Sequence, residues 1–289
     1  VDEKGEKMSK SKGNYISVND ALEKSGGDII RLCTVSMDYR NEMNTSFDLI
    51  MKTSDSYRRV RNTFRYLIGN LSDFNPAENS VDYKDLLEID RWALHKVQQL
   101  INAVTSAIES FEFHRIYYLI HNFCSVDMSA FYLDILKDRL YTFGKDSVGR
   151  RAGQTVLHHT LLVLVKLIAP ILVFTADEVW AEIQHKDEDV ESIHLAGWPC
   201  VVTEWINDDL NGRWHTILQI REEVSRELEK LRASKLIGNS LEARVDIFAE
   251  NKGLADMLKK VEKDFPMIFI VSEVKINENK PLESVQGQL

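Results

Sequence analysis

A run of lysines and serines near the start of the chain has the residue types that suit phosphate chemistry. It reads Lys7-Met8-Ser9-Lys10-Ser11 and continues as Lys12-Gly13-Asn14. An ammonium group on a long flexible stem can follow a moving phosphate, and serine hydroxyls and the backbone around a glycine supply donors and let a loop close. The segment therefore predicts a mobile loop whose residue types could meet a phosphate. The simpler alternative is a solvated lysine run at a frayed terminus.

Basic residues with helical spacing form a second candidate site. Arg58, Arg61, Asn62 and Arg65 lie three or four positions apart, so they share one face of a helix. Guanidinium groups bind phosphates in a bidentate manner and stack on unpaired bases, which suits single-stranded RNA loops. The alternative is a solvated or acid-paired arginine face. For the neighbouring Arg59 we expect an acidic partner inside the folded domain.

Weaker RNA candidates follow later in the chain. Arg115, His121 and Asn122 fall on a long helical stretch, where amide and imidazole groups can bond the edges of bases. A single histidine in a helical bundle is more often a packed residue, and His158-His159 are expected to be structural. The sequence contains no His-Glu-x-x-His pattern and no paired cysteines, so it predicts no metal site.

The overall charge limits how the chain can bind nucleic acid. Lys plus Arg number 36 and Asp plus Glu number 45, which gives a net charge of −9. Bulk charge of this sign does not attract RNA, so any RNA contact must come from local basic patches.

The three cysteines lie far apart in the sequence, which argues against a disulfide framework and favours a reducing cytoplasmic setting. The most apolar run, residues 160–174, is shorter than the roughly 20 residues that span a bilayer, so no membrane segment is expected.

These candidate residues must be positioned by a mainly helical fold. At 289 residues, with 44% hydrophobic and 28% charged, the chain can form one large domain or two to three small ones. Apolar residues that recur at three and four positions predict helices over residues 48–71, 89–111, 113–136 and 154–168. Asp28 is expected to cap a short helix over residues 31–35. Thr175-Ala-Asp-Glu178 has the pattern of a capping box, which would start a fifth helix.

The pattern changes near residue 205, where we place a domain boundary. A long charged helix is predicted over residues 208–234. Alternation from Leu241 to Ile247 and β-branched residues from Met267 to Ile276 predict two strands, with a helix over residues 254–261 between them. The predicted fold class is therefore mainly α, with a helical bundle followed by a small α+β domain.

The lysine run resembles the signature loop of class I aminoacyl-tRNA synthetases. The similarity continues through Gly26-Gly27-Asp28-Ile-Ile-Arg31-Leu32 and Asp38-Tyr39, as in isoleucyl-tRNA synthetases. The segments Ser56 to Arg65 and Asn70 to Pro76 resemble the first helix of that family's anticodon-binding bundle. Segments that resemble later parts of the family are Ala169 to Leu172, Thr175 to Trp180, Ser192 to Pro199 and Lys235 to Ala243. The resemblance thus covers nearly the whole chain.

For the loop, the resemblance implies ATP binding by Lys7, Met8, Ser9, Lys10 and Ser11. The family's reaction is attack of an amino-acid carboxylate on the α-phosphate of ATP, which places negative charge on the departing pyrophosphate. By this resemblance Lys10 and Lys7 are catalytic residues, with Lys10 as the principal pyrophosphate ligand and Lys7 as its support. ATP with Mg²⁺ would enter as a substrate of the full enzyme.

For the rest of the chain, the resemblance implies three functional parts. Residues 1–46 would hold the lysine loop and stem-contact segment that end a catalytic domain, residues 47–205 a helical-bundle anticodon-binding domain, and residues 206–289 an α+β junction domain. The implied partner is tRNA(Ile), and the implied tRNA-binding residues are Arg58, Arg61, Asn62, Arg65, Arg115, His121, Asn122, Arg221 and Lys235. A monomeric, cytoplasmic enzyme is expected.

Two features of the family are absent from this sequence. Its nucleotide-binding core, with a His-x-Gly-His element and the isoleucine pocket, would precede residue 1, so this chain alone is not expected to activate isoleucine. The zinc knuckle of paired cysteines is not present either. Two alternatives stay open. A valyl- or leucyl-tRNA synthetase fragment shares the lysine loop, while the later segments favour isoleucine. A stand-alone tRNA-binding helical module would have no upstream catalytic half.

Overall fold

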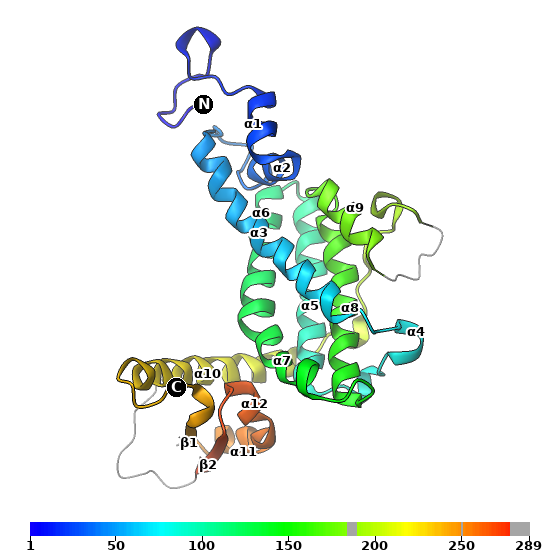
Figure 1. Ribbon diagram of the computed structural model, residues 1–289, viewed down its shortest axis with the longest axis vertical. Coiled ribbons are helices and arrows are strands. Elements are labelled where there is room, and N and C mark those ends of the chain that lie inside the picture. The colour runs from blue at the N-terminus through cyan, green and yellow to red at the C-terminus, as the bar shows by residue number, and fades with distance from the viewer. Residues whose placement is uncertain (184–189, 250, 278–289) are drawn as a thin grey trace. The chain divides into compact units, whose positions relative to one another are not determined.

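The computed structural model describes residues 1–183, 190–249 and 251–277, and it confirms a mainly helical fold (Figure 1). The chain divides into two compact units, Val1–Ile206 and Asn207–Leu289.

The first unit begins with short elements that follow the lysine run. A 3₁₀ turn over Lys10–Lys12 precedes the helices α1 (Val18–Ser25) and α2 (Gly27–Val35). Cys33 and Ile50 belong to a small apolar core that joins α1 and α2 to the first turn of the next helix. This core attaches α1 and α2, the helices that follow the lysine-rich segment, to the start of α3.

Long amphipathic helices form the bundle that makes up most of the first unit (Figure 1). They are α3 (Phe47–Asn70), α5 (Glu88–Glu109), α6 (Phe113–Asn122), α7 (Leu133–Thr142), α8 (Val148–Ile168) and α9 (Val173–Ala181), with a short α4 (Pro76–Asn79) after α3. Helix α5 packs against both α6 and α8. Helix α8 is apolar nearly all round and is central to the bundle, so side chains such as Val156, Leu161 and Val165 are completely buried.

The stretch predicted as one helix over residues 113–136 contains a π-helical segment, Phe123–Tyr132, between α6 and α7. At its end the N–H of Leu133 donates to the C=O of Met128, five residues back. The wider turn lets Cys124 and Phe131, among others, face the core together. The apolar spacing predicted a helix here but did not reveal this change of pitch.

A buried ion pair fixes one end of the bundle. Arg139 on α7 donates from Nη1 and Nη2 to the two carboxylate oxygens of Asp90 on α5, at 2.8 and 2.7 Å. The Tyr132 hydroxyl also donates to Asp90, and Arg139 donates to the carbonyl of Gly149 at the start of α8. The side chains of Arg139 and Asp90 are 2% and 0% exposed. Each charge is therefore paired and hydrogen-bonded, which is the condition under which buried charges are tolerated.

The second unit is a small α+β domain. Its elements are α10 (Asp208–Ala233), β1 (Arg244–Phe248), α11 (Lys252–Lys259), α12 (Phe265–Phe269) and β2 (Glu273–Asn277). The two strands pair in parallel, with Val245 opposite Val274. A parallel pair needs a crossover connection, and the intervening helices provide it.

The predicted strand over residues 267–276 was wrong in its first half. Phe265, Ile268 and Phe269 are buried with the three- and four-residue spacing of a helix, and Pro266 lies in the first turn. A short apolar run with β-branched residues is compatible with either element, and here the helix forms. The first strand also begins later than predicted, because residues 240–242 form a 3₁₀ turn.

Candidate nucleic-acid interface

The lysine-rich segment is a loop closed by the side chain of Asn14. The N–H of Ser9 donates to Asn14 Oδ1 at 2.9 Å, and Asn14 Nδ2 donates to Asp2 Oδ2 at 2.9 Å. This hydrogen bond from Asn14 is the main reason why the pKa of Asp2 is lowered. Gly13 adopts φ 70°, the left-handed conformation that lets the chain turn back at this point. Asn14 was not predicted as a functional residue, although its place after a glycine is typical of a turn.

The three lysines of this loop have different surroundings. Lys12 pairs with Glu6 at 3.2 Å. Lys7 and Lys10 are exposed, and in the described part of the chain neither has a carboxylate partner. Lys10 Nζ lies 5.6 Å from the centroid of the Tyr15 ring, a cation–π contact that leaves the ammonium accessible. Lys7 and Lys10 can therefore meet an incoming phosphate without first breaking an ion pair.

Met8 and the two serines complete the loop. Met8 is half-buried. Ser9 Oγ accepts from the N–H of Lys12 at 3.3 Å and lies 3.2 Å from Ser11 Oγ. Of the predicted phosphate-binding residues, Lys10 and Ser11 thus lie in one short turn, and the side chain of Ser9 caps this 3₁₀ helix.

Helix α2 is attached to the bundle by a buried carboxylate. Asp28 accepts hydrogen bonds from the N–H of Phe174, the N–H of Thr175 and the Thr175 hydroxyl, at 3.3, 2.8 and 2.6 Å. These amides belong to the first turn of α9, so Asp28 caps a helix far away in the sequence. The prediction that Asp28 caps its own helix was wrong, because α2 already begins at Gly27.

The capping box predicted at Thr175 was also wrong. Helix α9 begins at Val173, so Thr175 lies inside its first turn. Its hydroxyl donates to Asp28, and the carboxylate of Glu178 contacts Arg61 on α3 instead of reaching back. The carboxylate of Asp28 on α2 takes the place of a local cap. A pattern within residues 175–178 cannot reveal a cap that comes from another helix.

A chain of hydrogen bonds connects this cap to the surface of α3. Arg61 Nη1 donates to the Tyr57 hydroxyl at 2.8 Å, and that hydroxyl lies 3.0 Å from Thr175 Oγ1. Because a guanidinium can only donate and a carboxylate can only accept, the direction is fixed from Arg61 through Tyr57 and Thr175 to Asp28. Such a chain between a cation and an anion polarises each of its members.

The predicted basic face of α3 lies at the surface. Arg58 pairs with Asp55 at 3.0 Å, in the manner of a solvated helical ion pair. Asn62 and Arg65 are exposed, as is Arg59, for which a partner inside the bundle was predicted wrongly. None of these three side chains has an ion-pair or hydrogen-bond partner among residues 1–183, 190–249 and 251–277. The surface of α3 therefore carries the exposed guanidinium groups of Arg59 and Arg65, with the amide of Asn62 between them in the sequence.

The predicted residues on α6 occupy three different environments. Arg115 is paired with Glu112 at 2.6 Å, whereas Asn122 is exposed. His121 is half-buried, and its ring stacks on Tyr117 with the centroids 6.1 Å apart. Burial lowers the pKa of His121, and the nearby Arg59 guanidinium lowers it further. A neutral imidazole at this position can donate or accept one hydrogen bond with a base edge.

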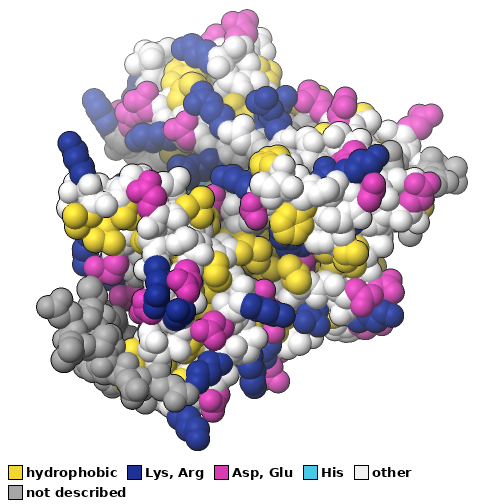
Figure 2. Space-filling view, turned by 60° about the horizontal axis from the view of Figure 1, so that its bottom comes forward, with side chains coloured by type: hydrophobic (Ala, Val, Ile, Leu, Met, Phe, Trp, Pro, Cys, Tyr) yellow, Lys and Arg dark blue, Asp and Glu magenta, His cyan; other side chains and the backbone are white. Residues whose placement is uncertain are grey.

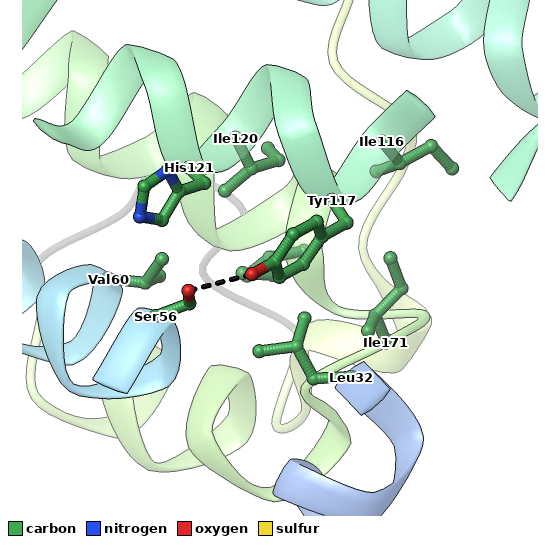
Figure 3. Close-up of a pocket in the computed structure, with 9 residues that line it drawn as sticks. Leu32, Ser56, Val60, Ile116, Tyr117, Ile120, His121 and Ile171 are labelled. Atoms are coloured by element: carbon green, nitrogen blue, oxygen red, sulfur yellow. Dashed lines mark hydrogen bonds between the residues drawn. The ribbon is translucent and has the colours of Figure 1, made fainter. Parts of the chain in front are cut away.

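His121 also lines a shallow, mostly apolar pocket between α2, α3, α6 and α8 (Figure 3). Figure 3 shows the Ser56 hydroxyl of α3 pointing at the Tyr117 hydroxyl of α6, and the two oxygens are 2.7 Å apart. This contact holds α3 and α6 side by side. Beside this contact, the Arg59 guanidinium of α3 lies near enough to the His121 ring of α6 to lower its pKa, so the two helices are neighbours at this point.

The two predicted ligands of the second unit are placed differently. Arg221 on α10 is half-buried and donates from Nε to the carbonyl of Ile268 at 3.0 Å, so it braces α12. Lys235 is exposed and has a positive φ of 59° just after α10 ends. Both lie in the second unit, away in the sequence from the ligands on α3 and α6.

The surface charge is mixed rather than uniformly basic. On the face in Figure 2, Lys and Arg side chains alternate with Asp and Glu side chains.

Within the described ranges, no group of three or more His, Cys, Asp or Glu side chains is placed to hold a metal ion. Of the helices in the same part of the chain, none is both long enough and apolar enough to cross a membrane.

Comparison with known proteins gives two family matches. The family "tRNA synthetases class I (I, L, M and V)" matches residues 1–46, and "Anticodon-binding domain of tRNA ligase" matches residues 90–247. The chain is 46% identical over 281 residues to the isoleucine–tRNA ligase of Moorella thermoacetica and 45% identical over 283 residues to that of Caldicellulosiruptor bescii. Each match covers 96% of this chain, and the chain spans 30% of the length of each relative.

A solved structure shares the fold. It is the LeuRS–tRNA–LeuAMS ternary complex from Agrobacterium radiobacter, with a TM-score of 0.55 and 21% sequence identity, covering 72% of this chain and 24% of that chain. The helical bundle described above and a family match over more than half of the chain lead to the same conclusion. The chain belongs to the tRNA ligase family that carries this anticodon-binding domain.

Proposed function

We propose that this chain is the lysine-loop and tRNA-binding portion of an isoleucine–tRNA ligase. The relatives that match nearly all of it carry that name, and they extend well beyond it. The complete enzyme would join isoleucine to tRNA(Ile) with consumption of ATP, and this portion would bind the tRNA and contribute the loop that holds the phosphates. A monomer in the cytoplasm is the proposed form.

The observation that carries the proposal is the exposed basic face of α3 in a chain of the anticodon-binding family. Arg59, Asn62 and Arg65 are solvent-accessible on α3, and Arg59 lies near His121 of α6. Guanidinium groups in such a setting bind phosphates and stack on unpaired bases, and amides bond base edges. We propose that these residues, with Arg58, Arg61 and Arg115, contact the tRNA, and that Arg221 and Lys235 make further contacts from the second unit.

The lysine loop supports the second part of the proposal. In the complete enzyme, Lys10 would bind the departing pyrophosphate and Lys7 would support it, while Ser9, Ser11 and the backbone at Met8 complete the ATP contact. Mg²⁺ would arrive with ATP and neutralise part of the phosphate charge. Because the pyrophosphate gains charge as the bond breaks, a lysine that meets it stabilises the transition state more than the bound substrate.

Binding of the 289-residue chain to tRNA transcripts tests the RNA part directly. We expect a preference for tRNA(Ile) over tRNA(Val) that follows the anticodon when the two anticodons are exchanged. A series of salt concentrations should give a log–log slope that reflects the number of phosphate contacts. Arg65→Ala should flatten this slope by about 0.7–0.9 for one lost contact.

Arg226→Ala provides the matched control, since Arg226 is an exposed arginine in a helical ion pair outside the predicted interface. It should leave both the affinity and the slope unchanged. A preference that follows the valine anticodon would favour the valyl enzyme. Binding that ignores the anticodon would favour the stand-alone module, and absence of tRNA binding would contradict the proposal.

A further inference from the structure

Phe111 ends helix α5 in a conformation that normally requires glycine. Its φ is 55°, its N–H donates to the C=O of Ile108, and the N–H of Glu112 donates to the C=O of Ala107. These two bonds form a Schellman motif, in which Phe111 is the left-handed residue where glycine is strongly preferred. A bulky side chain here costs stability, and backbone strain of this kind is a reason to look for a function at the position.

The Phe111 side chain is mostly exposed, and its ring contacts that of Phe113. It is 62% exposed. Its ring meets the Phe113 ring edge to face at 6.0 Å between centroids, and Phe113 in turn lies 6.1 Å from the ring of Tyr39, which is 51% exposed. We call these three rings the aromatic row. It joins the turn between α5 and α6 to the segment that follows α2.

Two guanidinium groups flank the aromatic row. Arg40 and Arg115 both approach the carboxylate of Glu112, at 3.8 and 2.6 Å, and Arg40 also pairs with Asp38 at 2.9 Å. Two cations and two anions leave the patch without net charge. The patch therefore does not resemble a phosphate site, and contact with it should depend little on salt.

We propose that the aromatic row stacks an unpaired base of bound tRNA, with Phe111 as its outermost ring. Exposed aromatic rings beside guanidinium planes are the surfaces on which proteins stack unpaired bases. A flat base can cover one ring and leave the ion pairs of Arg40 and Arg115 in water. A protein surface that buried the rings would also desolvate those ion pairs, which is unfavourable. The proposal rests on the tRNA binding proposed above and adds a base-stacking site outside the ligands on α3.

Substitutions at Phe111 separate stacking from folding. In the 289-residue chain, Phe111→Gly should keep the midpoint of thermal unfolding at or above that of the unchanged chain, since glycine accepts the left-handed conformation. The same variant should weaken binding of a tRNA(Ile) transcript by about tenfold, without a change in the salt slope. Phe111→Leu should lose the same affinity, whereas Phe111→Trp should retain it, because it keeps an aromatic face.

Two controls make the result specific. Phe174→Leu removes a phenylalanine that is 65% exposed outside the aromatic row, and it should leave the affinity unchanged. Arg65→Ala should alter the salt slope, in contrast to the Phe111 variants. Unchanged affinity in Phe111→Gly and Phe111→Leu, while the unchanged chain binds tRNA, would overturn the stacking site alone. A chain that binds no tRNA would overturn the proposed function as well.

Discussion

Neighbouring lysines of the loop differ in whether a carboxylate already holds them. Lys12 pairs with Glu6, whereas Lys10 faces the Tyr15 ring and solvent. An ammonium without an acidic partner can approach a phosphate without losing an ion pair first. Lys10 and Lys12 are therefore not equivalent as candidate phosphate ligands, although both are lysines of the same loop.

Lys10→Ala in the complete enzyme should slow isoleucine-dependent ATP–pyrophosphate exchange far more than it weakens isoleucine binding. The reason is that the charge met by Lys10 develops in the transition state. Lys12→Ala is the matched control and should have a small effect on exchange. The role assigned to Lys10 would have to be abandoned if both variants lost exchange equally, or if isoleucine binding fell as much as the rate.

Asp73 predicts a pH dependence of stability. Its carboxylate accepts from Arg150 at 2.6 and 3.0 Å and from Gln154 at 2.8 Å. The Arg150 hydrogen bonds are the main cause of a pKa lowered from 3.8 to about 2. Because the folded value is the lower one, this stabilisation is complete above pH 4 and is lost as the pH falls through 2.

Asp73→Asn should therefore lower the free energy of unfolding near neutral pH, by up to about 1 kcal/mol given the partial exposure of the pair. Urea unfolding at pH 7, 4 and 2.5 should show the gap to the unchanged chain closing as the pH falls. Asp85→Asn, at an exposed aspartate, should show no such trend. A gap that stays constant with pH would contradict the assignment.

At the scale of elements, the first turn of α9 depends on a side chain from α2. Asp28→Asn replaces one acceptor oxygen by a donor that faces the N–H groups of Phe174 and Thr175. We expect the free energy of unfolding to fall by about 1–3 kcal/mol, the typical cost of a buried group left unsatisfied. Hydrogen exchange of the amides in residues 173–177 should accelerate.

Asp20→Asn is the control for this experiment, since Asp20 lies exposed in the first turn of α1. Its exchange pattern should match that of the unchanged chain. If the amides of α9 keep their protection in Asp28→Asn, then the cap comes from another group.

The elements differ in how well their sequence predicts them. Apolar spacing predicts α3, α5 and α8 because each buries a continuous stripe of side chains, and that pattern is local. The cap by Asp28 depends on residues almost 150 positions apart, so no window of sequence contains it. Helix α12 was missed because five apolar residues fit a strand as well as a helix until their neighbours are known.

The residues of the candidate site also differ in how well the sequence predicts their surroundings. Exposure of Asn62 and Arg65 follows from their place opposite the apolar stripe, and the spacing predicts it. The contacts of Arg61 with Tyr57 and Glu178 could not be predicted from the spacing, because the contact with Glu178 requires α9 to lie beside α3. The aromatic row could not be predicted either, since it depends on a turn conformation that its sequence disfavours.

At the scale of the whole molecule, the division into two units predicts that unfolding is not a single transition. The second unit has fewer than half the residues of the first. Smaller units bury a smaller fraction of their surface and are less stable, so the second unit should unfold at a lower urea concentration. Hydrogen exchange at increasing urea should release the amides of β1 and β2 before those of α5 and α8. One common midpoint for both sets would contradict this expectation.

The buried pair of Asp90 and Arg139 also limits how this chain can change over evolutionary time. Replacing either partner alone leaves the other charge buried without compensation, at a cost of about 3–5 kcal/mol. Replacing both with apolar side chains of similar volume can be neutral. An apolar version of this contact is thus accessible in energy, but every stepwise mutational route to it passes through an intermediate that has lost a large share of the usual stability of a domain. The pair would then persist because its first replacement is harmful, whatever it contributes to the fold today.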